Sequence, residues 1–159
     1  MVRLIVLLAA LAAAAPARKA VEPLEFSARA EPAVARVGQP VTIRLRWRNA
    51  SPEGTAPLRL NKRGLLGREV TLELRGPGGK RVPLKALAAR ELSDLDFQTL
   101  APGERLEYHY DLGFLAQASL RPGRYEVRAV YANDETRGEP KAWTGRLRAS
   151  VRFRVLEPD

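Results

Sequence analysis

Few residues of this chain could carry out catalysis. The sequence contains a single histidine, His109, and no cysteine. A hydrolase needs a nucleophile with a base, a pair of carboxylates or a metal ion. His109 alternates with Tyr108 and Tyr110, and this parity predicts a solvent-facing side chain on a strand. Because zinc needs several converging ligands, we expect neither a zinc site nor a catalytic residue, and we interpret the protein as a non-enzyme.

Two acidic groups are candidates for calcium binding through oxygen ligands. Asp94 and Asp96 are two residues apart, and residues 133–135 form an acidic loop with Glu139 nearby. Neither group has the ligand spacing and central glycine of a dedicated calcium loop, so solvated carboxylates are the simpler interpretation. The glycine-rich residues 76–79 lack the Lys-Ser/Thr ending of a phosphate loop and predict a hairpin turn. We expect no metal ion and no cofactor.

The residues that could bind a partner lie in loops. Leu65 and Leu66 are large apolar residues in a segment bounded by glycines and flanked by basic residues. They could fold over the open end of the structure, or they could form an exposed apolar tip with a basic rim, which is typical of a partner-binding surface. Trp143 follows a polar loop and could cap the fold or contact a ligand. The candidate partner-binding residues are Lys62, Arg63, Leu65, Leu66, Arg68 and Trp143.

Alternating segments predict the strands that must position these loops. Residues 41–48, 125–131 and 150–155 alternate apolar residues with arginine or other polar residues, as strands with one buried face do. About seven to nine such segments are separated by turn residues at roughly ten-residue spacing, and no helical period dominates. Residues 85–95 are expected to form a loop or one or two helical turns. We predict an all-β, antiparallel two-layer β-sandwich.

The parity of each strand predicts which side chains are buried. Trp47 shares the parity of its apolar neighbours and is expected in the core, whereas Asn49 is expected to close a turn with its own side chain rather than to accept a glycan. The predicted inner faces comprise Phe26, Val41, Ile43, Leu45, Trp47, Leu72, Leu74, Leu106, Tyr108, Tyr125, Val127, Ala129, Val151, Phe153 and Val155. The predicted outer faces carry Arg44, Arg46, Arg128, Arg152 and Arg154.

The N-terminal residues predict export. Arg3 precedes an apolar run at residues 4–15, and residues 15–17 have the small-x-small pattern of a cleavage site, so residues 1–17 have the features of a secretory signal peptide. An uncleaved anchor is the alternative, but the run is shorter than the roughly 20 residues that span a bilayer. We expect a flexible lead at residues 18–23, a sandwich domain at 24–157, and a periplasmic or extracellular protein without a disulfide or lipid anchor.

The charge composition is strongly basic. The formal net charge is +9, and 22 of the 27 lysine and arginine residues are arginine. The arginines are spread along the strands, which codon bias in a GC-rich genome explains as well as selection for a polyanionic ligand does. Binding to an acidic polysaccharide is therefore the alternative to a solvated surface. Export argues against nucleic acid as the physiological partner.

Turn and core residues resemble the immunoglobulin-like β-sandwich of secreted bacterial proteins. These residues are Gly38-Gln39-Pro40-Val41 with Leu45 and Asn49, Leu100-Ala101-Pro102-Gly103-Glu104 with Asp111-Leu112, Pro122-Gly123-Arg124-Tyr125 with Val127 and Tyr131, and Trp143-Thr144-Gly145-Arg146-Leu147 with Ser150, Val151 and Phe153. The pattern is similar to the non-catalytic module that precedes the zinc domain of deuterolysin-like metallopeptidases. The resemblance implies an immunoglobulin-like fold with a binding or accessory role, and the family's catalytic residues match nothing here.

A second resemblance is to secreted immunoglobulin-like inhibitors of cysteine peptidases. Residues 76–79 match their Gly-x-Gly-Gly loop, but their Thr-Thr-Gly loop is missing and Arg121-Pro122 is followed by Gly123 rather than an aromatic residue. We therefore expect a secreted non-catalytic module that binds another secreted or envelope protein. The alternatives are a peptidase inhibitor that presents residues 61–68 and 75–80, and a polyanion-binding envelope protein.

Overall fold

The computed structural model describes residues 23–158. The predicted signal peptide and nearly all of the predicted flexible lead lie outside the described residues. The strands are β1 (Leu24–Glu31), β2 (Val34–Arg36), β3 (Thr42–Asn49), β4 (Leu58–Asn61), β5 (Val70–Arg75), β6 (Arg81–Val82), β7 (Phe97–Leu100), β8 (Arg105–Asp111), β9 (Gly123–Asn133) and β10 (Gly145–Leu156). The helical turns are η1 (Gly64–Gly67), η2 (Pro77–Gly79), η3 (Asp94–Asp96) and α1 (Leu112–Leu115).

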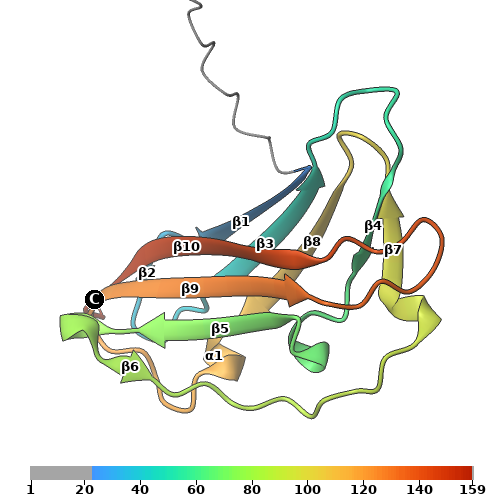
Figure 1. Cartoon of the computed structure of the whole chain (residues 1–159). Coiled ribbons are helices and arrows are strands. Elements are labelled where there is room, and N and C mark those ends of the chain that lie inside the picture. Colours follow the sequence, from blue (N-terminus) through green and yellow to red (C-terminus); the bar gives the residue numbers. More distant parts are fainter. Residues whose placement is uncertain (1–22, 159) are drawn as a thin grey trace, which may run out of the picture.

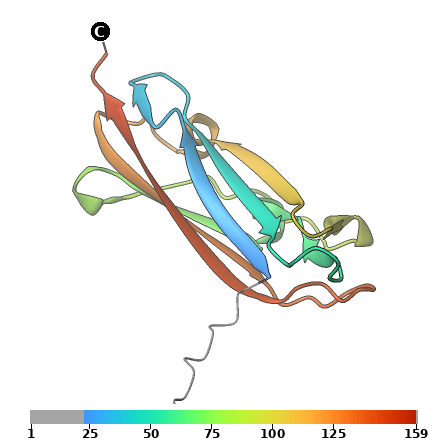
Figure 2. The same ribbon diagram turned by 90° about the horizontal axis from the view of Figure 1, so that it is seen from above.

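The strands form two facing sheets and a small additional pair (Figures 1 and 2). One sheet has the order β1-β3-β8, and the other has the order β2-β10-β9-β5-β6. All neighbours are antiparallel except β2 and β10, which are parallel. The β9–β10 hairpin beside β5 corresponds to the F, G and C strands of an immunoglobulin sandwich. The predicted all-β, immunoglobulin-like sandwich is thus confirmed.

The described residues contain ten strands, slightly more than the seven to nine expected. Two of the additional elements are very short, since β2 has three residues and β6 has two. The β4–β7 pair stands at one end of the sandwich, on the right of Figure 1. The last strand, β10, is longer than the alternating segment 150–155, because no turn residue interrupts the chain between Gly145 and Leu156.

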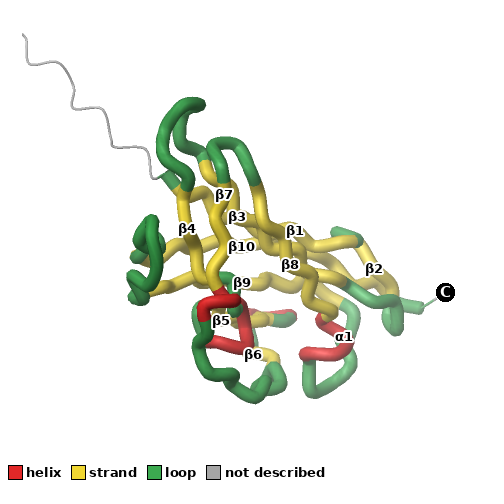
Figure 3. The backbone as a smooth tube through the Cα atoms, turned by 90° about the vertical axis from the view of Figure 1, so that its right-hand side faces the viewer, coloured by secondary structure: helices red, strands yellow, loops and turns green. Residues whose placement is uncertain are grey.

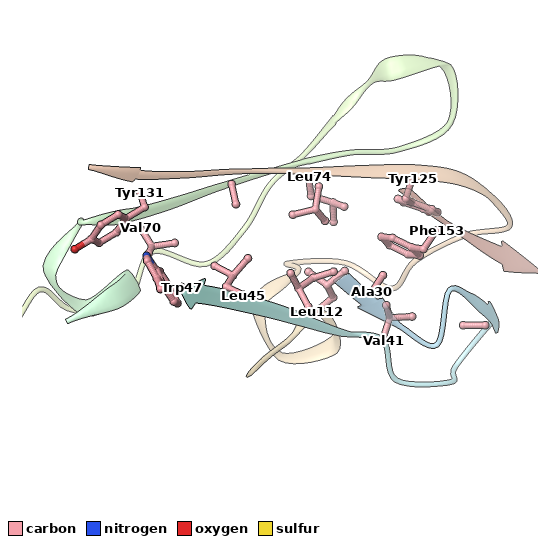
Figure 4. Close-up of a cluster of buried hydrophobic side chains, with 14 of the residues drawn as sticks. Ala30, Val41, Leu45, Trp47, Val70, Leu74, Leu112, Tyr125, Tyr131 and Phe153 are labelled. Carbon is pink, nitrogen blue, oxygen red and sulfur yellow. The ribbon is translucent and has the colours of Figure 1, made fainter. Parts of the chain in front are cut away.

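Along the strands, the alternating apolar and polar side chains point alternately into the core and toward solvent. Along β3, Ile43, Leu45 and Trp47 are buried, while the arginines between them face outward. In Figure 4 the buried side chains fill the space between the two layers. Trp47 contacts Tyr131 edge-on at a ring distance of 5.4 Å, which joins the two sheets. The predicted core is confirmed, with Phe26, Leu72, Leu106, Tyr108 and Val151 half-buried at its margins.

The helical elements are short turns in the loops (Figure 3). Residues 85–93 form a loop, and η3 adds the single turn that the sequence allowed. Asn49 is buried and its side-chain oxygen accepts the N–H of Ser51 at 3.0 Å, which confirms the predicted turn. Between Pro23 and Pro158, no helix is long and apolar enough to cross a membrane.

A tyrosine fixes the connection that enters β9. The hydroxyl of Tyr125 donates to the carbonyl of Arg121 at 2.8 Å and accepts the N–H of the same residue at 2.9 Å. This arrangement is the tyrosine corner found at the start of strand F in immunoglobulin-like sandwiches. Gly123 completes the corner with a φ of 147°, and a Cβ atom there would lie 2.2 Å from Pro77. The corner therefore requires glycine and holds η2 against the start of β9.

We expect the substitution Tyr125→Phe to lower the free energy of unfolding by about 1–3 kcal/mol. It removes both hydrogen bonds and leaves the N–H and the carbonyl of Arg121 without these partners. Urea unfolding followed by circular dichroism measures this loss, and the slope of the transition should stay that of the wild-type protein. A variant as stable as the wild type would show that the corner does not contribute to stability.

Candidate functional site

Three of the predicted partner-binding residues line one groove. Lys62, Arg63 and Leu65 face a hollow of about 600 Å³ between η1, β8 and the loop that precedes η3. We call it the η1 groove. Its other lining residues are Leu87, Arg90, Leu95, Asp96, Tyr108, His109 and Tyr110. Leu95 is 83% exposed, so apolar surface is accessible at the margin of the groove.

Arg63 is held by a buried polar network rather than presented to solvent. Its guanidinium group pairs with the carboxylate of Glu69, and the two side chains are 13% and 7% exposed. The side-chain amide of Asn61 donates to Glu69 at 3.0 Å and to Asn133 at 3.2 Å. The hydroxyl of Tyr131 donates to the carbonyl of Asn61 at 2.9 Å. Arg63 therefore ties the η1 loop to β9 and has little freedom to contact a partner.

A second ion pair closes the other side of the groove. The carboxylate of Asp96 is buried and pairs with Arg90, and it accepts the N–H of Ser93 at 2.7 Å. Burial opposes ionisation of Asp96, but the bonds from Arg90 and Ser93 outweigh it and lower the pKa of the carboxyl group. Asp94 points elsewhere and lies 3.6 Å from Arg137. The two carboxylates considered for calcium thus have different partners, and residues 23–158 contain no group of three possible metal ligands.

Two tyrosines of β8 attach η1 to the three-stranded sheet. The hydroxyl of Tyr108 donates to the carbonyl of Lys62 at 2.5 Å. Burial raises the pKa of Tyr110 to about 12. A Cβ atom on Gly64 would lie 2.6 Å from the hydroxyl oxygen of Tyr110, and Gly64 has a φ of 66°, so glycine is required where the loop meets β8. His109 is exposed, as predicted from its parity.

Two of the remaining candidates do not line this groove. Arg68 lines two other hollows, one with Leu65 and one with Arg63. Leu66 belongs to the backbone turn η1, and its side chain lies outside the described part of the structure. Trp143 stacks on Tyr131 at a ring distance of 5.8 Å and caps the end of the core. The η1 groove is therefore shared by Lys62, Arg63 and Leu65, whereas Arg68 and Trp143 do not line it.

A second surface was not among the predicted sites. Strands β6, β5, β9 and β10 lie side by side, and their outward side chains form what we call the arginine face. Among the described residues, these outward positions hold eight arginines and two glutamates. The arginines are Arg75, Arg81, Arg124, Arg128, Arg146, Arg148, Arg152 and Arg154, and the glutamates are Glu73 and Glu126.

The outer face of the opposite sheet has nearly balanced charge. Within the described chain, the outward positions of β1, β3 and β8 hold five arginines and four carboxylates. They are Arg29, Arg44, Arg46, Arg48 and Arg105, with Glu25, Glu31, Glu107 and Asp111. Arg44 pairs with Glu31 at 2.7 Å and Arg46 with Glu107 at 2.6 Å. The positive charge of the sandwich is therefore concentrated on one of its two faces.

The arginine face is hollowed at its centre. A depression of about 620 Å³ is lined by the short side chains of Thr71, Val130 and Ser150. Its charged lining residues are Arg81, Arg128, Arg148, Glu73 and Glu126. Arg128 lies 2.9 Å from Glu126, and Arg75 lies 2.5 Å from Glu73. By contrast, no ion pair within residues 23–158 involves Arg124, Arg146, Arg148 or Arg154.

Comparisons with known proteins identify no family for this chain. The chain matches no family model, and a search of curated proteins finds no match. Among solved structures, it is similar to the crystal structure of the CARDB domain of the PF1109 protein from Pyrococcus furiosus, in complex with di-metal ions. The TM-score is 0.38 with 12% sequence identity, over 85% of this chain and 94% of that chain. No functional residue is transferred from it.

The buried pair beneath the η1 groove should contribute strongly to stability. We expect Glu69→Gln to lower the free energy of unfolding by about 3 kcal/mol, because it leaves the Arg63 guanidinium buried beside a neutral amide. Glu25→Gln is the matched control, since its pair with Arg48 is about half exposed and should cost about 0.5 kcal/mol or less. Chemical denaturation measures both values, and equal losses would contradict a structural role for the Arg63–Glu69 pair.

Proposed function

We propose that this protein is a secreted, non-catalytic β-sandwich module that binds an acidic polysaccharide through the arginine face. The observation that carries the proposal is the asymmetry of charge between the two sheets: eight arginines with two glutamates on one outer face, and five arginines with four carboxylates on the other. Codon bias would enrich arginine on both faces alike. A ligand with negative charge gives a reason for the difference.

Arginine is well suited to this task. Its planar guanidinium group stays charged and forms paired hydrogen bonds with carboxylate and phosphate groups. A sulfate group is tetrahedral like phosphate and can accept the same pair of hydrogen bonds. No ion pair within residues 23–158 involves Arg124, Arg146, Arg148 or Arg154. The guanidinium N–H groups of these arginines are therefore available to a ligand. The face is also hollowed, which suits a polymer chain better than a flat bilayer.

Two other polyanionic partners fit the face less well. Proteins that bind single-stranded nucleic acid stack bases on aromatic side chains, and the outward positions of the described β5, β6, β9 and β10 carry no aromatic residue. Peripheral membrane binding generally adds an apolar surface that enters the lipid. The largest apolar outward side chain on β9 is Val130, which is half-buried. Acidic polysaccharide needs neither feature.

The N-terminal sequence supports an extracytoplasmic site of action. We propose that residues 1–17 direct export, that residues 24–157 form the binding domain, and that the protein acts in the periplasm or outside the cell. Acidic polysaccharides occur in these compartments as envelope and capsule components. Nucleic acid is not the expected ligand there.

The proposal predicts that charge reversal on the arginine face weakens binding. We expect the double variant Arg148→Glu with Arg154→Glu to bind a sulfated polysaccharide of the heparin type about tenfold or more weakly, since contacts of about 1.5 kcal/mol or more each become repulsive. The wild-type protein should also lose affinity as sodium chloride is raised, because charge-driven association is screened. Fluorescence anisotropy with a labelled polysaccharide measures both effects.

A matched control separates a specific face from general net charge. Arg29 and Arg105 are exposed on the opposite sheet, and no ion pair in the described chain involves either. The variant Arg29→Glu with Arg105→Glu changes the net charge by the same amount as the test variant. It should keep nearly wild-type affinity. Equal losses in the two variants would refute a dedicated face, and a wild-type protein that binds no acidic polysaccharide would refute the proposed function.

A second candidate function is protein binding at the η1 groove. It is favoured by the exposed Leu95 beside Leu65, Leu87 and the two tyrosines of β8, with Lys62 at the rim. Apolar surface of this kind marks many interaction sites. The loops suggested for a peptidase inhibitor, residues 61–68 and 75–80, lie at opposite ends of β5 (Figure 1). This separation disfavours an inhibitor that uses both loops together.

Protein binding at the groove is tested with a substitution and its control. Leu95→Asp should abolish retention of a secreted protein that the wild type captures from culture supernatant and that mass spectrometry identifies. Phe114→Asp is the control, because Phe114 is 60% exposed and lies outside the groove. A captured protein that both variants still retain would rule out the groove as its binding site.

A further inference from the structure

We infer that the anionic polymer lies along β10 and is held at two points, one at each end of the central depression. One point consists of Arg146 and Arg148, and the other consists of Arg124 and Arg154. This inference rests on the proposed function of the arginine face, and it adds the direction of the ligand and the residues that hold it.

The first argument is the row of charges on one strand. Arg146, Arg148, Arg152 and Arg154 all face outward from β10 and are all exposed. Residues two apart on a strand are about 6.6–6.8 Å apart, so the row from the first to the last arginine is roughly 26 Å long. A row of this length faces several repeating units of an extended polymer at once. A compact anion could contact only part of it.

The second argument is that the arginines differ in what already neutralises them. On the β5 and β9 side of the face, Glu73 holds Arg75, and Glu126 holds Arg128. Arg152 is 3.9 Å from Glu126, a weak pair on an 85% exposed side chain. Four of the arginines without an ion-pair partner in the described chain lie at the two ends of the row, and Arg81 lies on β6 at the far edge of the sheet. The polymer should therefore be held at the ends of β10.

The third argument is a repulsive pair at one end. Arg154 of β10 and Arg124 of β9 are register partners across the two strands. Like charges directly opposite each other destabilise a sheet, and no ion pair within residues 23–158 compensates either side chain. A carboxylate or sulfate placed between the two guanidinium groups removes the repulsion and receives hydrogen bonds from both. This pair is thus a binding point for one anionic group.

The centre and the margin of the row also fit an extended polymer. Ser150 occupies the middle position where the alternation would place another arginine, and it lines the depression with Thr71 and Val130. The uncharged part of the polymer can lie over these short side chains. Beyond Arg146, the adjoining hollow is lined by Arg68 but also by the carboxylates Asp134 and Glu135. These carboxylates offset the charge of Arg68, so the strongly basic part of the row ends here.

The direction of the polymer is tested with single arginine-to-glutamine variants. We expect Arg146→Gln, Arg148→Gln, Arg124→Gln and Arg154→Gln each to reduce the slope of log affinity against log salt by about one, since each removes one charge contact that releases a counterion. Arg75→Gln is the control on the same face, because Arg75 is already paired with Glu73, and it should leave the slope unchanged. The ligand is a labelled sulfated dodecasaccharide, titrated over a series of sodium chloride concentrations.

Length and chemistry of the ligand complete the test. Affinity should rise from disaccharide to longer sulfated oligosaccharides and level off once the chain covers the row, and a carboxylated oligogalacturonate series distinguishes carboxylate from sulfate recognition. A slope change in the Arg75 variant, with none in the β10 variants, would overturn the inference while leaving the proposed function intact. Absence of oligosaccharide binding by the wild type, or stronger binding to single-stranded DNA or anionic vesicles, would overturn both.

Discussion

The pairing of β9 with β10 determines both faces of the five-stranded sheet. Its eleven register pairs place Tyr125 opposite Phe153 and Val127 opposite Val151 on the inner side. The same pairs place Arg124 opposite Arg154 on the outer side. Because successive side chains alternate, a slip of one residue would turn the arginines of β10 into the core and its aromatic residue into solvent. The core and the arginine face are therefore two results of one register.

Much of this arrangement could be predicted from the sequence. Strict alternation identified the main strands, the burial of Trp47 and the outward direction of Arg152 and Arg154, because burial on a strand depends on local parity. The concentration of charge could not be predicted in this way. It depends on which strands become neighbours, and the contact of β9 with both β10 and β5 is set by long-range packing. The sequence predicts which arginines of a strand face outward, but it does not predict that these strands lie side by side in one sheet.

The η1 loop illustrates the same limit for single side chains. Its composition suggested an apolar tip with a basic rim, yet Arg63 pairs with Glu69 and joins a buried network with Asn61 and Asn133. Asn133 lies 72 residues after Asn61 in the sequence, so the local sequence around either residue does not predict their contact. Leu65 and Lys62 do line a groove, as a binding loop would. Which basic residues are available to a partner is decided by their distant neighbours.

The difference in charge between the two sheets also affects how the molecule approaches a ligand. Eight arginines and two glutamates give one outer face a formal charge of +6, whereas five arginines and four carboxylates give the other +1. Charges separated in this way make the sandwich an electric dipole directed across its thickness. The field of a polyanion turns such a molecule before contact, so that more encounters occur in the productive orientation and association is faster. For the proposed acidic ligand, the unequal sheets thus affect the rate of binding as well as its location.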